Sequence, residues 1–158
     1  MTIDKTNEET AMDVERFVDA QNQIWPQPVN EIRGGKKRSH WTWFVLPQIR
    51  GLGRSRFAIH YSIRDLEEAR AYLAHPVLGP RLVEINEAMM GLESISAERV
   101  LGGIDALKLQ SCATLFEAAG GDDVFARVLA KYFLNQRCPQ TLGYLKEPAV
   151  LEDPSATT

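Results

Sequence analysis

Cysteine is scarce in this sequence of 158 residues. The two cysteines, Cys112 and Cys138, lie far apart and do not form a CxxC or Cys/His spacing. That scarcity excludes a disulfide framework and a cysteine-based zinc site. A chain of this length buries enough surface to fold without either device. We therefore expect both thiols to be reduced and packed inside the protein, with no bound metal.

Long hydrophobic runs are also absent. No uncharged apolar stretch approaches the ~20 residues that a membrane-spanning helix requires. The first ten residues are polar and acidic, without the apolar segment of a secretion or transit signal. We therefore expect a cytoplasmic protein with no membrane partner.

The motifs of several enzyme classes are missing as well. The sequence contains no GxSxG, no HExxH and no Asp-rich calcium loop. Its glycine-rich stretch, Gly51–Ser55, lacks both the third glycine of a dinucleotide fingerprint and the Gly-Lys-Ser/Thr ending of a P-loop. The sequence therefore gives no support to a hydrolase, metalloenzyme, NTPase or Rossmann enzyme, and it predicts no cofactor.

Helical periodicity is the main signal that is present. The residues Leu78, Leu82, Ile85 and Met89 form one apolar stripe at spacings of four, three and four. Similar patterns, with caps and glycine stops, predict helices over 13–24, 29–33, 63–75, 97–101, 106–119, from 122 or 123 onward, and 139–144. The fold class is thus mainly α: a single compact multi-helical array over 13–146, with flexible ends at 1–12 and 147–158.

The segment at about 34–61 departs from this periodicity. Proline and glycine interrupt it at Pro47, Gly51 and Gly53, so we expect loops with short helical or extended pieces, and a short hairpin near 43–61. Two helix starts are predicted from capping residues, Ser62 for the helix that follows this segment and Asp105 for the helix over 106–119.

Charge is distributed unevenly along the chain. No acidic residue occurs between Ile32 and Arg64, whereas the remainder of the chain holds ten basic and 21 acidic residues. The basic residues of this segment are Arg33, Lys36, Lys37, Arg38, Arg50, Arg54, Arg56 and Arg64. A basic segment on an acidic body creates a local positive potential, which attracts an anionic partner.

The same basic segment carries most of the residue types that suit a nucleotide-like ligand. Aromatic faces stack on bases, and cationic groups hold phosphate. The candidate ligand contacts are Trp41 and Trp43 as stacking surfaces and Lys37, Arg54, Ser55 and Lys108 as anion contacts. His40 is the candidate acid or base, because imidazole titrates near neutral pH, and Gln48 is a candidate orienting group.

Two alternatives remain open at this point. The basic residues can simply screen the acidic helices while the aromatic cluster packs beneath a long loop. The segment can also serve as a non-catalytic interaction surface for a protein or nucleic acid, although the net charge of −3 and the absence of a basic helix count against DNA.

The chain also resembles a known family. Its matching stretches are Glu15–Gln21, Lys37–Phe44, Pro47–Gln48, Gly51–Ser55, Glu68–Leu82, Lys108–Leu109 and Thr114–Phe116. They resemble a bacterial family known as domain-of-unknown-function family 1810, whose members are sometimes labelled calpastatin. The resemblance covers about 13–146 and implies a compact helical array, without an established reaction. Calpastatin-type inhibitors are disordered, which disagrees with the apolar core expected here, and Trp25–Pro28 departs from the family pattern by its prolines.

Overall fold

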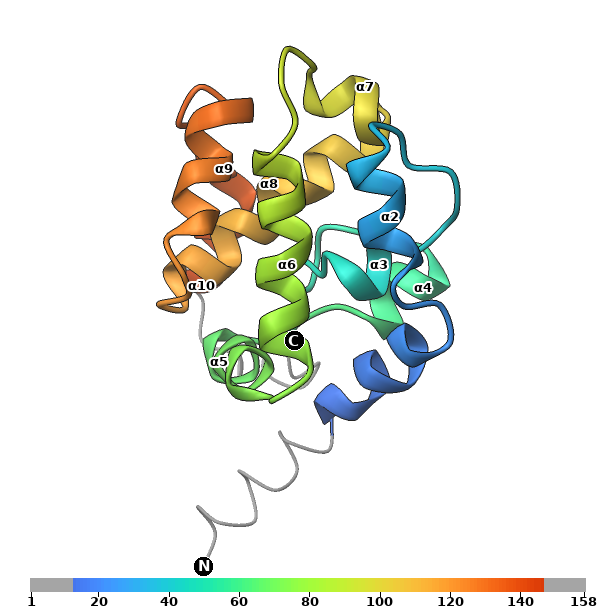
Figure 1. The fold of residues 1–158 in the computed structure, drawn as a ribbon. Helices are drawn as coiled ribbons and strands as arrows, with labels where there is room; N and C mark the ends of the chain where they lie inside the picture. The colour runs from blue at the N-terminus through green and yellow to red at the C-terminus, as the bar shows by residue number, and fades with distance from the viewer. Residues whose placement is uncertain (1–12, 147–158) are drawn as a thin grey trace, which may run out of the picture.

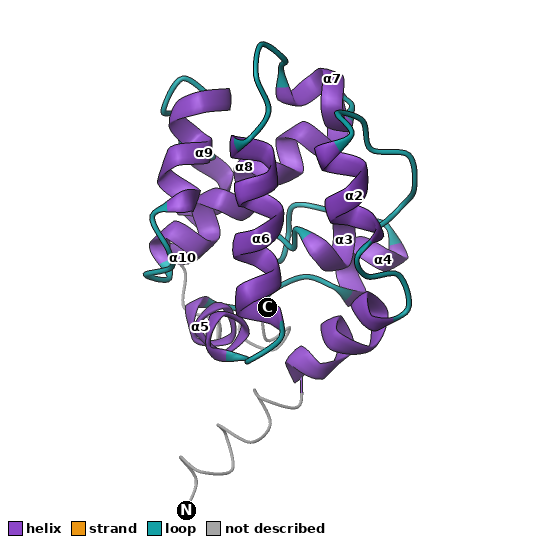
Figure 2. Ribbon diagram, in the orientation of Figure 1, coloured by secondary structure: helices purple, strands orange, loops and turns teal. Residues whose placement is uncertain are grey.

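The computed structural model describes residues 13–146. The predicted flexible ends, 1–12 and 147–158, lie outside the described residues and are drawn in grey in Figure 1. Helices account for the regular structure of the described part, which contains no strand (Figure 2). They are, in chain order, 13–22, α2 (Gln27–Arg33), α3 (Thr42–Val45), α4 (Arg56–His60), α5 (Leu66–Ala74), α6 (Leu78–Met90), α7 (Ala97–Leu101), α8 (Gly103–Ala118), α9 (Val124–Tyr132) and α10 (Pro139–Lys146).

The helix predicted from the clearest periodicity is confirmed as α6. Its four stripe residues, Leu78, Leu82, Ile85 and Met89, are all buried. The helix contacts α2, α5 and α9, so the stripe faces the interior on more than one side. Burying four such side chains contributes about 6–12 kcal/mol before the entropy cost of ordering them is counted.

Helix α8 runs through the body of the protein. Its buried residues include Leu109, Cys112 and Phe116, and it contacts α5, α7, α9 and α10. The bulk of this sixteen-residue helix is therefore fixed by packing. The start of the helix is not packed in this way, because the capping residue Gly102 and the first two helical residues, Gly103 and Ile104, are exposed to solvent.

The segment at 34–61 contains the short helices α3 and α4, joined by irregular chain. The predicted hairpin near 43–61 is wrong, since the extended pairing there is a single isolated parallel bridge between Ile49 and Ile63. Glu31 of α2 holds the start of the segment. Its carboxylate accepts hydrogen bonds from the backbone N–H groups of Arg38 and Ser39 and from the Trp41 indole.

Both predicted caps prove to be misplaced. Helix α5 is capped by Asp65, whose carboxylate accepts from the Glu68 N–H at 2.9 Å, because the bridge at Ile63 keeps the chain extended past Ser62. Helix α8 begins at Gly103, so Asp105 lies inside its first turn rather than ahead of it.

Candidate functional site

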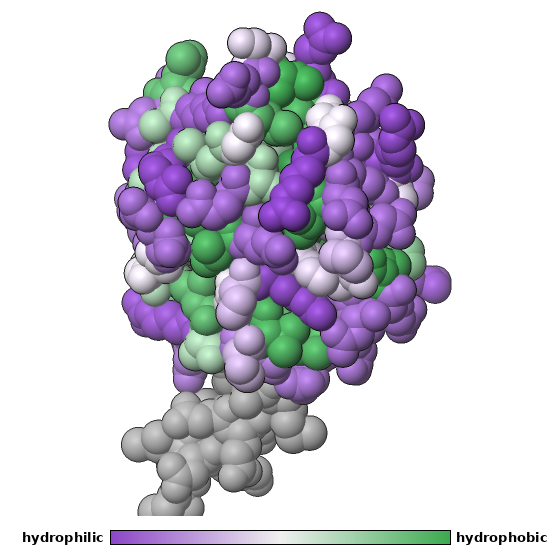
Figure 3. Space-filling view, viewed as in Figure 1, coloured by the Kyte–Doolittle hydropathy of each residue, from purple (hydrophilic) through white to green (hydrophobic). Residues whose placement is uncertain are grey.

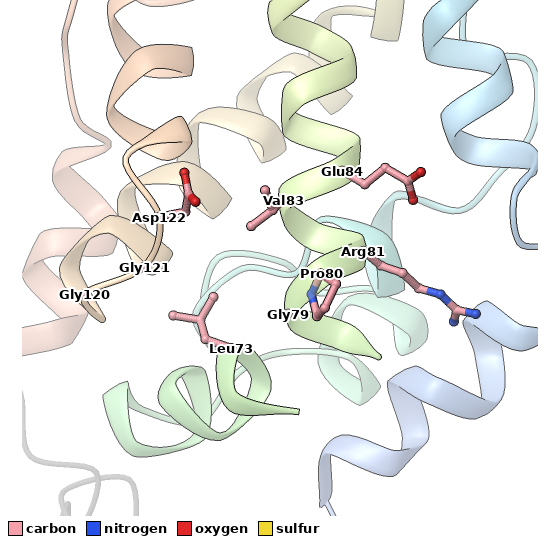
Figure 4. Close-up of a pocket in the computed structure, with 9 residues that line it drawn as sticks. All are labelled: Leu73, Gly79, Pro80, Arg81, Val83, Glu84, Gly120, Gly121 and Asp122. Carbon is pink, nitrogen blue, oxygen red and sulfur yellow. The ribbon is translucent and has the colours of Figure 1, made fainter. Parts of the chain in front are cut away.

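One wide hollow on the described part of the protein lies away from the basic segment. It is an open depression of about 850 Å³ between α5, α6 and the turn from α8 to α9, as Figure 4 shows. Arg81 points away from the turn and donates to Asn22, while Asp122 accepts from the Val124 N–H. On the face in Figure 3, apolar surface appears only in small areas between polar side chains. None of the predicted site residues lines this hollow.

The predicted residues gather instead around a groove beside the first turn of α8. The groove consists of two adjoining depressions that share Trp43 and Ile104. The first lobe, about 320 Å³, is lined by Lys37, His40, Thr42, Trp43 and Leu101–Asp105. The second lobe, about 350 Å³, is lined by Trp43, Gln48, Leu52–Ser55, Ala58, Ile104, Leu107, Lys108, Ser111 and Gln140. All of the candidate residues except Trp41 line one lobe or the other.

The first lobe opens onto the N-terminal end of α8. The capping residue there is Gly102, at φ 90°, so no side chain caps the helix. The first N–H groups of a helix have no partner within the helix, and its dipole places partial positive charge at this end. The exposed pair Gly102 and Gly103 adds no side chain that would cover these groups. The lobe therefore presents hydrogen-bond donors to an anion.

Three charged side chains meet at the same end of α8. The amine of Lys37 lies 2.9 Å from the Asp105 carboxylate, and that of Lys108 lies 3.4 Å from it. Burial would raise the pKa of Asp105, but the hydrogen bond and charge of Lys37, followed by the nearby Thr42 hydroxyl and the charge of Lys108, lower it below its ordinary value. Asp105 is therefore ionised at neutral pH, and the cluster carries a net charge of +1.

Thr42 is the most unusual member of the first lobe. The residue is only 2% exposed, and its hydroxyl has no hydrogen-bond partner of normal geometry within the described residues, although it lies near enough to Asp105 to influence its pKa. A buried hydroxyl without a partner costs about 1–3 kcal/mol. Its place on the wall of the lobe means that a bound molecule can supply the missing partner.

The two candidate tryptophans have different surroundings. Trp41 is 2% exposed, and its indole N–H donates to Glu31 at 2.9 Å, so its ring is not accessible to a ligand and the packing alternative describes it well. Trp43 is half-buried and separates the two lobes. The Lys108 amine lies 4.9 Å from its ring, and the Phe57 ring lies 5.4 Å away with a 41° tilt.

The glycine-rich stretch forms one side of the second lobe for reasons of packing. Gly51 has φ 95°, and a Cβ at this position would lie 2.6 Å from the Tyr144 ring of α10. A Cβ at Gly53 would lie 2.5 Å from that of Ala58. Ser55 caps α4 by accepting from the Ala58 N–H. These glycines are thus explained by close contacts rather than by a phosphate-binding loop.

Two candidate polar groups are unengaged within the described part of the chain. Arg54 is exposed and makes no hydrogen bond or ion pair there. The His40 ring, on the first lobe, also has no hydrogen-bond partner among residues 13–146. A catalytic imidazole is normally oriented by a partner on its second nitrogen, and such a group is missing from this part of the site.

The sequence reasoning missed several residues that complete the groove. They are Thr42, Gly102, Gly103, Asp105 as a partner of two lysines, and Gln140. The open helix end could not be recognised from the sequence, because Asp105 suggested a capped start whereas the helix begins two residues earlier, at Gly103. The others depend on contacts between distant parts of the chain.

Comparison with known proteins places the chain in a family. Residues 11–145 match the family described as protein of unknown function (DUF1810). The chain belongs to this family. It is also similar to the conserved hypothetical protein Rv1873 from Mycobacterium tuberculosis, whose crystal structure superimposes with a TM-score of 0.84 at 44% sequence identity, over 86% of this chain and 98% of that one. No curated protein matches the sequence.

The similarity to this crystal structure confirms the compact helical array expected from the sequence, and neither the family nor this relative is described with an activity. Among residues 13–146, none of the helices has the length and hydropathy of a membrane span, and no cluster of three or more His, Cys, Asp or Glu side chains is arranged to bind a metal ion.

Proposed function

We propose that this member of the DUF1810 family binds a phosphate-bearing small molecule of the cytosol in the groove beside α8. The observation that carries the proposal is the coincidence, in one lobe, of an uncapped helix end with the buried hydroxyl of Thr42, which lies near the Asp105 carboxylate but makes no hydrogen bond of normal geometry within residues 13–146. A phosphate oxygen accepts hydrogen bonds from both kinds of donor. The combined volume of the two lobes suits a ligand of nucleotide size.

The charges around the groove support an anionic ligand. The lysine pair outweighs Asp105 by one unit, and Arg54 and Ser55 lie at the opposite end, on the second lobe. The backbone N–H of Lys37 donates to the Val100 carbonyl at 2.8 Å, which fixes this lysine beside the start of α8. A ligand entering the groove therefore meets positive potential at both ends.

The proposed role of the groove is ligand binding, and catalysis there is a second step beyond it. A reaction in this groove would use His40 as its acid or base, because an imidazole can both donate and accept a proton, and Gln48 to orient the substrate. Nucleotides and ADP-ribose-like molecules are the ligand classes to test first, since they combine phosphate with a planar base.

The test is a thermal-shift panel of phosphate, pyrophosphate, nucleotides, ADP-ribose and sugar phosphates. A ligand present at 100 times its Kd stabilises the folded state by about 2.7 kcal/mol, which raises Tm by about 5–10 °C for a domain of this size. If no member of the panel raises Tm, the proposal is wrong.

The variant Thr42→Val sharpens this test. Removing a buried hydroxyl without a partner leaves the stability unchanged or raises it by about 1 kcal/mol. The same change removes a hydrogen bond to the bound anion and lowers affinity about tenfold or more. Thr141→Val is the matched control, because that hydroxyl is also buried without a partner of normal geometry and Thr141 does not line the groove.

A second candidate function is a non-catalytic interaction surface. Three large apolar side chains around the groove are exposed, Phe57 at 54%, Ile104 at 75% and Leu107 at 62%. Apolar side chains beside basic ones suit an acidic protein segment that carries apolar residues. The double variant Ile104→Ser with Leu107→Ser distinguishes the two functions. It weakens such a protein partner, while a small phosphate ligand in the first lobe still binds.

A further inference from the structure

We infer that the second lobe binds a nucleobase, so that the ligand is a nucleotide whose phosphate lies at the start of α8 and whose base lies between Gln48 and Gln140. This inference rests on the proposed function, since it assigns an orientation to the same ligand. It follows from the different chemistry of the two lobes on either side of Trp43.

The walls of the second lobe combine apolar side chains with polar ones, and the apolar part suits a planar ring. The apolar side chains include Trp43, Leu52, Ala58 and Leu107, and Trp43 also lines the first lobe, where the phosphate is proposed to lie. Small-molecule sites are commonly apolar clefts in which a few polar groups fix the orientation of the ligand. A base can lie flat against these walls, whereas a second phosphate would be desolvated there without an open helix end to receive it.

The polar groups of the lobe are suited to the edge of a base. The side-chain amides of Gln48 and Gln140 make no hydrogen bond with any described residue. Each amide offers two donors and one carbonyl acceptor, the combination that reads the mixed donors and acceptors of a base edge. A phosphate has only acceptors at its oxygens and would leave the amide carbonyls without partners.

Backbone contacts fix the positions of both glutamines on the lobe. The carbonyl of Gln48 accepts from the Ile63 N–H at 2.8 Å, as part of the parallel bridge between Ile49 and Ile63. Gln140 lies in the first turn of α10, one turn before Tyr144, whose hydroxyl donates to the Gly51 carbonyl at 3.4 Å. The contact between Tyr144 and Gly51 therefore keeps α10 against the loop that carries the other wall.

Arg54 and Lys108 favour a competing assignment, in which the second lobe binds a second phosphate. Both cationic side chains line this lobe, so a ligand with a phosphate at each end is the alternative. Lys108 is already engaged, at 3.4 Å from the Asp105 carboxylate and 4.9 Å from the Trp43 ring, so its charge is partly balanced within the protein. Arg54 is exposed at the mouth, where a guanidinium plane can also stack on a base.

The experiment measures the affinity of the full-length protein for AMP, ribose 5-phosphate, inorganic phosphate and fructose 1,6-bisphosphate by calorimetry. We expect AMP to bind at least about tenfold more tightly than ribose 5-phosphate, because only AMP fills the second lobe. Gln140→Ala and Gln48→Ala should each weaken AMP about three- to tenfold and leave ribose 5-phosphate unchanged. Gln136→Ala is the matched control, since this exposed glutamine lies outside the groove.

The outcomes separate this inference from the proposed function. Binding of ribose 5-phosphate as tight as that of AMP, or AMP binding that is insensitive to both glutamine variants, overturns the inference and leaves the phosphate site in place. Tighter binding of the bisphosphate than of AMP assigns the second lobe to a second phosphate and also overturns it. Binding of none of the four probes contradicts the proposed function itself. Gln140 is exposed, so Gln140→Ala stays informative even if Gln48→Ala fails to fold.

Discussion

The carboxylate of Glu31 is predicted to hold the first lobe's wall in place, and Glu31→Gln tests this. Its two oxygens accept from the Arg38 N–H at 2.8 Å, the Ser39 N–H at 3.1 Å and hydroxyl at 2.7 Å, the Trp41 indole at 2.9 Å and the Gln27 amide at 2.8 Å. These donors come from α2 and from the segment leading into α3. The single side chain thus ties the chain between Gly35 and Trp41 to α2.

The expected cost follows from the change in charge and in hydrogen bonding. A hydrogen bond to a charged group contributes about 1.5–3 kcal/mol, against about 0.5–1.5 kcal/mol for a neutral pair. Glutamine keeps one acceptor oxygen but presents an NH₂ group to donors at the other. We expect Glu31→Gln to reduce the free energy of unfolding by about 2–3 kcal/mol at pH 7, which lowers Tm by about 5–10 °C.

The pH dependence gives an independent check on the same contacts. Burial acts to raise the pKa of Glu31, but hydrogen bonds from Ser39, the Arg38 backbone, Trp41 and Gln27 lower it from 4.5 to about 2. A lowered pKa stabilises the folded state above the unfolded value and loses this contribution as pH falls through the folded value. The full shift corresponds to about 3 kcal/mol, which solvent screening of a partly exposed group reduces to about 1–2 kcal/mol.

The assay is urea unfolding of the wild type and Glu31→Gln at pH 7 and pH 3, followed by circular dichroism. The difference in unfolding free energy between the two proteins should be smaller at pH 3. Glu93→Gln, an exposed glutamate on the turn after α6, is the control and should change stability by less than about 0.5 kcal/mol. An equally small effect of Glu31→Gln at pH 7, or a difference that does not change with pH, would refute this account of the segment.

Two more predictions test the site and the helix packing. Asp105→Asn should strengthen phosphate binding several-fold, because it removes the negative charge of the first lobe. It should also cost about 1–3 kcal/mol of stability, because the amine of Lys37, only 9% exposed, loses its partner; weaker binding in calorimetry would contradict the anion site. Gly79→Ala should destabilise the protein by about 1–3 kcal/mol, because the added Cβ would lie 2.2 Å from the Leu73 carbonyl oxygen. Gly143→Ala is the control and should not destabilise, because the space around Gly143 is open. Equal melting temperatures for the two variants would exclude the close contact at Gly79.

The main helices could be predicted because their signals are local. The stripe of α6 repeats every three to four residues, so all of its members lie on one face of the helix and are buried together against the protein interior. The short helices α3 and α4 carry no such stripe, and α4 has no buried residue. Helix α4 has a local cap at Ser55, and the ring contact between Trp43 and Phe57 joins the two helices. Propensity alone does not reveal such elements.

All of the predicted site residues except Trp41 line the groove, and the charge pattern of the segment explains part of this. A segment without acidic residues must lie against acidic parts of the protein or remain solvated, and both occur here. Lys37 pairs with Asp105, whereas Arg54 remains unpaired among the described residues. The sequence could not indicate that Trp41 is buried while Trp43 is accessible, because the distinction depends on the hydrogen bond from Trp41 to Glu31, ten residues earlier.

The two unsatisfied features of the first lobe have a common explanation. Helix ends without a cap are ordinary at a solvated surface, and a buried hydroxyl without a partner can be satisfied by a water molecule. Water explains each feature separately, but it carries no charge and gives no reason for two lysines to converge on the same helix end. The proposed anion would accept hydrogen bonds from the helix N–H groups and from Thr42, and it would balance the excess positive charge. Stable proteins depart from capping and burial rules mainly where function requires it, so these departures at one place favour a binding site over a packing defect.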